Sequence, residues 1–170
     1  MNSGSRIFIV GPMGAGKTTI GRRLAKSLRR KFVDSDQELE RRTGASIALI
    51  FDVEGENGFR ERERQIVEEL TQLEDIVLAT GGGAVLDPDN RAAISTRGFV
   101  VYLHASIDKL IERTQRDSGR PLLETDDPTA LMLELLEQRE PIYQQVADLI
   151  VDTGAMTMEE IVKEIRDARP

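Results

Sequence analysis

Short apolar runs alternate with longer amphipathic stretches along this chain. The runs lack the polar and apolar alternation of a half-exposed strand, which predicts strands buried on both faces of a parallel sheet. We expect strands at 7–10, 32–33, 76–79, 99–103 and 149–151.

Apolar residues recur at helical spacing among charged ones between these runs. After the first run the stripe consists of Ile20, Leu24 and Leu28, and further helices are expected at 35–43, 46–51, 58–73, 90–96, 107–116, 128–138 and 158–166. Ser35 and Glu38 have capping-box spacing, which places the start of the second helix at Ser35. This order predicts a single α/β domain over 1–170, a five-stranded parallel sheet flanked by helices on both faces. Ligands of such sheets bind outside the carboxyl ends of the strands.

The loop after the first predicted strand, Gly-Pro-Met-Gly-Ala-Gly-Lys-Thr, runs from Gly11 to Thr18 and fits the phosphate-binding loop pattern. Its glycines let backbone N–H groups turn toward phosphate oxygens, and the following helix adds positive potential. Lys17 can reach the β- and γ-phosphates, while the Thr18 hydroxyl can bind Mg²⁺. The predicted nucleoside triphosphate site consists of Gly11, Met13, Gly14, Ala15, Gly16, Lys17, Thr18 and Thr19.

Polar or glycine residues also follow the second and third strands. Asp34, nearest the strand end, can bind Mg²⁺ directly or through water. Asp36 either interacts with the N–H groups of a helix start, or orients a substrate hydroxyl and accepts its proton during phosphoryl transfer. The glycines at 81–83 either form a flexible turn or allow a ligand or backbone to approach closely.

Composition narrows the class of protein. The net charge of −7 argues against a general nucleic-acid binder. Cysteine is missing, which excludes a disulfide framework and a thiol nucleophile. We find neither a signal-peptide pattern nor an apolar run that could span a membrane, so we expect a cytoplasmic protein without a membrane partner. His104, the only histidine, lies away from every motif and is expected to be structural.

Taken in order, these motifs resemble those of the shikimate kinases over nearly the whole chain. The resemblance rests on the phosphate loop, the aspartate segment 32–36, the stretch 46–63, the glycine triplet 81–83, the Arg-Pro-Leu-Leu run at 120–123, and the segment with Arg139, Pro141 and Tyr143. It implies a kinase that uses ATP, with Mg²⁺ as cofactor, to phosphorylate the 3-hydroxyl of shikimate in the pathway to aromatic amino acids. We also expect a monomer.

The resemblance also implies roles for the acceptor-binding residues. Asp36 would bind ring hydroxyls and act as the base, beside Gly81, Gly82 and Gly83. Arg60 and Arg139 would hold the carboxylate of shikimate, because a guanidinium group matches a carboxylate in two hydrogen bonds. A surface ion pair is the alternative for either arginine. Glu63, one helical turn after Arg60, would orient it.

The same resemblance implies which residues contact the nucleotide and which segment forms a mobile lid. Arg113 would lie near adenine, with Asp152 also at the nucleotide. Arg120 would swing in from a lid at about 115–126 and meet the charge that develops on the transferring phosphoryl group. The acceptor would bind in a subregion at about 34–63.

Two other functions remain compatible with the sequence. A gluconate or nucleoside monophosphate kinase would share the phosphate loop, but a nucleotide acceptor favours aromatic or amide contacts rather than two arginines. A non-catalytic nucleotide-binding module, such as a GTP-dependent switch, would carry an Asn-Lys-x-Asp segment, which the sequence lacks.

Overall fold

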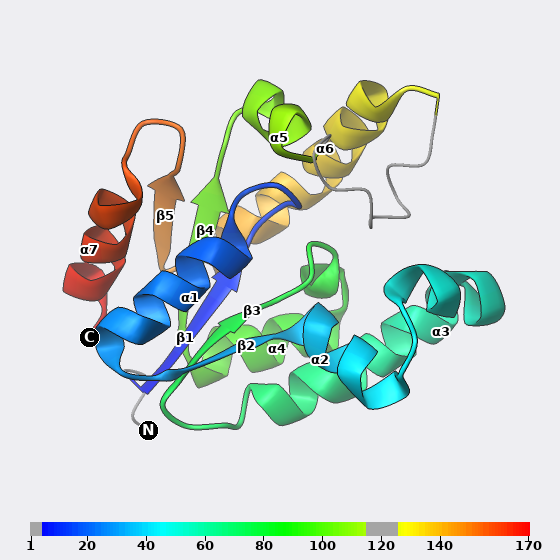
Figure 1. The fold of residues 1–170 in the computed structure, drawn as a ribbon, viewed down its shortest axis with the longest axis horizontal. Helices are drawn as coiled ribbons and strands as arrows, with labels where there is room; N and C mark the ends of the chain where they lie inside the picture. The colour runs from blue at the N-terminus through cyan, green and yellow to red at the C-terminus, as the bar shows by residue number, and fades with distance from the viewer. Residues whose placement is uncertain (1–4, 115–125) are drawn as a thin grey trace.

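A computed structural model describes residues 5–114 and 126–170 of the protein. These residues form a five-stranded sheet with the order β2-β3-β1-β4-β5 (Figure 1). Every neighbouring pair is parallel, which confirms the predicted α/β class. The strands are β1 (Arg6–Val10), β2 (Lys31–Asp34), β3 (Ile76–Ala79), β4 (Phe99–His104) and β5 (Leu149–Asp152).

Helices cover both faces of the sheet. They are α1 (Lys17–Leu28), α2 (Ser35–Thr43), α3 (Ile47–Leu70), α4 (Pro88–Arg97), α5 (Ile107–Thr114), α6 (Pro128–Val146) and α7 (Met158–Ala168), with the short 3-10 helix η2 (Ala84–Leu86). Alternate residues of the central strand β1 point to opposite sides. Ile7 and Ile9 pack with residues of α1 and α7, whereas Phe8 and Val10 pack with residues of α3, α4 and α6. Two apolar layers therefore hold the sheet from both sides.

The helix α3 joins two predicted helices into one bent element. The backbone at Gly55 has φ 74° and ψ −179°, which is not helical and which glycine adopts without strain. The expected break between 51 and 58 is thus a kink rather than a loop. Figure 1 shows the first part of α3 projecting away from the sheet beside α2.

The helix α6 runs further than the expected end at 138. It continues to Val146 through Pro141, although proline cannot donate the usual helical hydrogen bond. Met132, Arg139, Tyr143 and Val146 form a buried stripe along this helix. Burial of that stripe against β4 and η2 outweighs the local effect of the proline, and it brings Arg139 into a helix rather than a loop.

The start of α2 differs from the predicted capping box. The residue that caps the helix is Asp34, whose Oδ1 accepts hydrogen bonds from the backbone N–H groups of Asp36 (2.9 Å) and Gln37 (3.1 Å). The Ser35 Oγ instead accepts a hydrogen bond from the backbone N–H of Gly81 at 3.0 Å. The Asp34 carboxylate, at the end of β2, accepts hydrogen bonds from the free N–H groups at the start of the helix. The Ser35 hydroxyl therefore contacts the loop after β3 instead.

No helix of the described residues is long and apolar enough to cross a membrane.

Candidate active site

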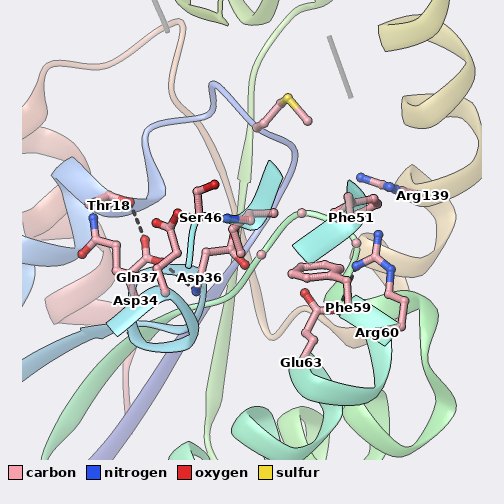
Figure 2. Close-up of a pocket in the computed structure, with 16 residues that line it drawn as sticks. Thr18, Asp34, Asp36, Gln37, Ser46, Phe51, Phe59, Arg60, Glu63 and Arg139 are labelled. Atoms are coloured by element: carbon pink, nitrogen blue, oxygen red, sulfur yellow. Dashed lines mark hydrogen bonds and ion pairs between the residues drawn. The ribbon is translucent and has the colours of Figure 1, made fainter. Parts of the chain in front are cut away.

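A pocket of about 410 Å³ lies where the loops after β1, β2 and β3 meet. Parallel strands end at the same edge of a sheet, so residues far apart in the sequence meet there. Figure 2 shows Thr18, Asp34 and Asp36 on one side of the pocket and Arg60 and Arg139 on the other. The pocket is therefore acidic toward the phosphate loop and basic toward α3 and α6.

The lysine of the phosphate loop is hydrogen-bonded to the backbone of the loop itself. The Lys17 Nζ donates hydrogen bonds to the carbonyl oxygens of Gly11 (2.7 Å) and Pro12 (2.9 Å). Gly14 and Gly16 have φ values of 86° and 94°, which side chains rarely allow. A bound phosphate would offer the ammonium group charged oxygens in place of these neutral carbonyls.

Thr18 and Asp34 are joined at the edge of this loop. The Thr18 Oγ1 donates a hydrogen bond to Asp34 Oδ2 at 2.7 Å, drawn as a dashed line in Figure 2. No group of three or more His, Cys, Asp or Glu side chains within 5–114 and 126–170 could hold a metal ion. A hydroxyl and one carboxylate nevertheless fit Mg²⁺, which keeps several waters and takes its other ligands from substrate phosphates.

The basic side of the pocket contains two largely buried guanidinium groups. Arg60 Nη1 donates a hydrogen bond to Glu63 Oε1 at 2.8 Å, and its guanidinium lies over the Phe59 ring, 5.1 Å from the centroid. Arg139 is only 5% exposed, and its Nε has no hydrogen-bond partner among the described residues. A buried N–H without an acceptor is costly, so an anionic ligand between the arginines would satisfy it.

Glu63 is a buried carboxyl in this positive surrounding. Its Oε1 pairs with Arg60, while its Oε2 has no hydrogen-bond partner in the described parts of the chain. Burial raises the pKa of Glu63, and the charges of Arg60 and Arg139 oppose that rise. The site therefore holds this side chain at a cost to folding.

The glycine triplet lies in the midst of these groups. A Cβ atom at Gly81 would lie 2.7 Å from Asp36 Oδ1 and 2.9 Å from Glu63 Oε2. At Gly83 it would lie 2.5 Å from Arg60 Nη2, and at Gly82 3.4 Å from Arg139 Nη1. Charged side chains thus approach the triplet closely, and the absence of side chains at 81–83 makes room for them.

Arg113 and Asp152, two of the predicted nucleotide residues outside the loop, do not line this pocket. Arg113 Nη1 donates to the Gly14 carbonyl at 3.1 Å, so it lies against the phosphate loop. Asp152 ends β5 and accepts a hydrogen bond from the Gly154 N–H at 2.9 Å. Arg120 and the predicted lid, except its last residue, lie outside the described residues. The His104 side chain does not line the pocket, and its Nε2 lies 3.8 Å from Glu140 Oε1.

Several pocket residues were not predicted as site residues. Gln37, Glu40, Ser46, Phe51 and Phe59 line the pocket. The rings of Phe51 and Phe59 meet with centroids 4.8 Å apart, although they belong to the two halves of α3. Only the kink at Gly55 brings them together, and nothing in the local apolar pattern indicates its direction.

Comparison with known proteins identifies the family. The sequence model of shikimate kinase matches residues 13–169. The chain belongs to the shikimate kinase family. It is 56% identical over 159 residues to the shikimate kinase of Bordetella pertussis, covering 94% of this chain and 75% of that one. The shikimate kinase of Shewanella amazonensis is 55% identical over 159 residues, covering 94% and 93%.

Solved structures agree with this assignment. The shikimate kinase of Acinetobacter baumannii, in complex with shikimate, superimposes with a TM-score of 0.93 at 46% identity, covering 96% of this chain and 91% of that one. A gluconokinase from Sinorhizobium meliloti has a TM-score of 0.62 at 21% identity, covering 99% and 93%. At that identity the gluconokinase shares the fold alone.

Replacing Glu63 should change how stability depends on pH. Burial raises the pKa of Glu63 above its ordinary value of 4.5. The contribution of Glu63 to the unfolding free energy is therefore fully present below pH 4.5, and it is lost as the pH rises through the raised pKa. Glu63→Gln cannot ionise. The difference in unfolding free energy, variant minus wild type, should therefore rise as the pH increases above 4.5 when urea unfolding is measured.

Glu134→Gln, at an exposed position of α6, is the control and should show no such trend. A difference that falls with pH would mean that the attraction of Arg60 and Arg139 for ionised Glu63 outweighs its burial.

Proposed function

We propose that this protein transfers the γ-phosphoryl group of ATP to the 3-hydroxyl of shikimate, giving shikimate 3-phosphate and ADP. The observation that carries the proposal is the pocket beside the phosphate loop, in which Arg60 and Arg139 face Asp36 across three glycines. The membership of the chain in the shikimate kinase family supports the same acceptor.

The acceptor fits the polarity of the pocket. Shikimate is a ring with one carboxylate and several hydroxyls. Arg60 and Arg139 would hold the carboxylate, which would give the buried Arg139 Nε an acceptor. The hydroxyls would then point toward Asp36 and the phosphate loop. Identity of 55–56% over 159 residues to the shikimate kinases of two bacteria favours this acceptor over gluconate.

Asp36 is the proposed base. The acceptor oxygen attacks the γ-phosphorus, its proton passes to the Asp36 carboxylate, and the bond between the γ-phosphorus and the β–γ bridging oxygen breaks. Lys17 would exchange the carbonyls of Gly11 and Pro12 for phosphate oxygens and offset the charge that develops on them.

Thr18 and Asp34 are the proposed holders of Mg²⁺, in keeping with their contact at the edge of the loop. When bound with ATP, this ion would neutralise phosphate charge. Arg113 and Asp152 would lie on the nucleotide side, and Arg120 would close over the phosphates from the lid. We further propose that a monomer is the active form.

An assay of ADP release tests the acceptor. We expect release with ATP plus shikimate, and only background release with ATP alone, gluconate or a nucleoside monophosphate. Lys17→Met should reduce the shikimate-dependent rate by at least about 100-fold, because a charge partner of the transition state is lost. Faster release with gluconate or a monophosphate than with shikimate would refute the proposed acceptor.

Asp36→Asn separates the base from a residue that only stabilises a helix start. We expect kcat to fall by about 100-fold or more, with a loss of unfolding free energy below about 1 kcal/mol. Asp89→Asn is a matched control, because Asp89 follows the capping Asp87 in α4 as Asp36 follows Asp34 in α2. Near-normal kcat in Asp36→Asn at saturating shikimate would leave only the helix-start role.

Gly83→Ala tests whether the triplet makes room for Arg60. Alanine fits the backbone there, at φ −97°, but its Cβ would collide with the Arg60 guanidinium. Loss of one charged hydrogen bond should raise the KM for shikimate by about 10-fold or more, with a smaller effect on kcat. In an Arg60→Ala background, Gly83→Ala should raise the KM for shikimate little further. Equal effects in both backgrounds would show that Gly83 acts independently of Arg60.

A further inference from the structure

Tyr143 connects helix α6 to the glycine triplet. It lies one helical turn after Arg139, on the same buried stripe, and its side chain is fully buried. Its Oη donates a hydrogen bond to the carbonyl oxygen of Gly82 at 2.5 Å. The helix that carries Arg139 is thereby bonded to the loop that the arginine faces.

The Tyr143 ring has little freedom to leave this position. It stacks on Tyr102 of β4, with centroids 5.1 Å apart and ring planes at 21°. Burial raises the pKa of Tyr143 to about 12, although the charge of Arg139 and its side-chain hydrogen bond with Tyr143 oppose the rise, so the hydroxyl stays protonated at neutral pH and also lies beside the Arg139 side chain. A phenol in this state is a constant hydrogen-bond donor to Gly82.

Gly82 lies where the two substrate sites meet. A Cβ there would lie 3.4 Å from Arg139 Nη1. The same Cβ would lie 3.6 Å from the backbone nitrogen of Met13 and 3.7 Å from the carbonyl oxygen of Gly11. A shift of Gly82 would therefore alter the spacing between the acceptor-binding arginine and the phosphate loop.

We propose that Tyr143 is a positioning residue of the phosphoryl transfer, which sets the spacing between Arg139 and the phosphate loop through the carbonyl of Gly82. The inference rests on the proposed function, because this spacing matters when Arg139 holds the acceptor and the loop holds ATP. Misplacement of reacting groups by about 1 Å can lower a rate by about 100-fold. A hydroxyl that touches neither substrate can thus affect turnover.

Tyr143→Phe removes the hydroxyl and keeps the stacked ring. The matched control is Tyr102→Phe, which removes the other hydroxyl of the same stack. Tyr102 Oη is buried and has no hydrogen-bond partner of good geometry within the described residues. Burial raises the pKa of Tyr102, and the nearby Glu140 carboxylate adds to the rise. The two variants lose the same group from neighbouring rings, and only one of them loses a bond to the triplet.

We expect kcat/KM for shikimate to fall by about 10- to 100-fold in Tyr143→Phe and by less than about twofold in Tyr102→Phe. Melting temperatures of both variants separate this effect from a loss of folded protein. Equal losses of kcat/KM in the two variants would overturn the inference.

A double-mutant cycle tests whether the effect passes through Arg139. In an Arg139→Ala background, Tyr143→Phe should lower kcat/KM by less than about threefold further, because the arginine to be positioned is gone. Full additivity of the two changes would also overturn the inference. Shikimate-dependent activity of the wild-type protein tests the proposed function by itself, whereas the comparison among variants tests only the role of Tyr143.

Discussion

The site depends on three consecutive residues without side chains at the end of β3. This strand lies between β2 and β1, so its carboxyl end adjoins both Asp34 and Asp36, at and just after the end of β2, and the phosphate loop after β1. Two carboxylates and two guanidinium groups approach the space that Cβ atoms at 81–83 would occupy. The opposite charges of the acceptor pocket can face one another at short range only because the backbone between them is bare.

This arrangement costs stability in the free protein and favours ligand binding. Glu63 and Arg139 are nearly buried, and each has an atom without a hydrogen-bond partner in the described part of the chain. Leaving such groups unsatisfied costs about 1–3 kcal/mol each. The fully buried apolar residues of β1 and β3 hold the strand ends in place despite this cost. A carboxylate ligand would supply the acceptor that Arg139 Nε lacks, so binding and stability are linked.

The sequence predicts the strands and the phosphate loop better than the geometry of the pocket beside them. Uninterrupted apolar runs indicate the five strands, and the loop from Gly11 to Thr18 has a motif with a fixed local geometry. Arg60 and Arg139 have no such local signal, and only the resemblance to a family indicates them. Their positions depend on the bend at Gly55 and on the continuation of α6 past Pro141, which tertiary packing decides. The role of Arg120 remains a prediction.

The contacts that hold the triplet also explain how both ends of one acceptor can be aligned. The Gly81 N–H is held by Ser35, which directly precedes the proposed base Asp36. The Gly82 carbonyl is held by Tyr143, one turn after Arg139. The N–H of Thr80, just before the triplet, donates to the Ile9 carbonyl of β1 at 3.1 Å. A single short backbone segment is therefore hydrogen-bonded to Ser35, next to the proposed base, to Tyr143, one turn after the proposed carboxylate-binding arginine, and to the strand that leads to the phosphate loop. Such a segment can fix the distance between the attacking hydroxyl and the phosphate without contacting either through a side chain.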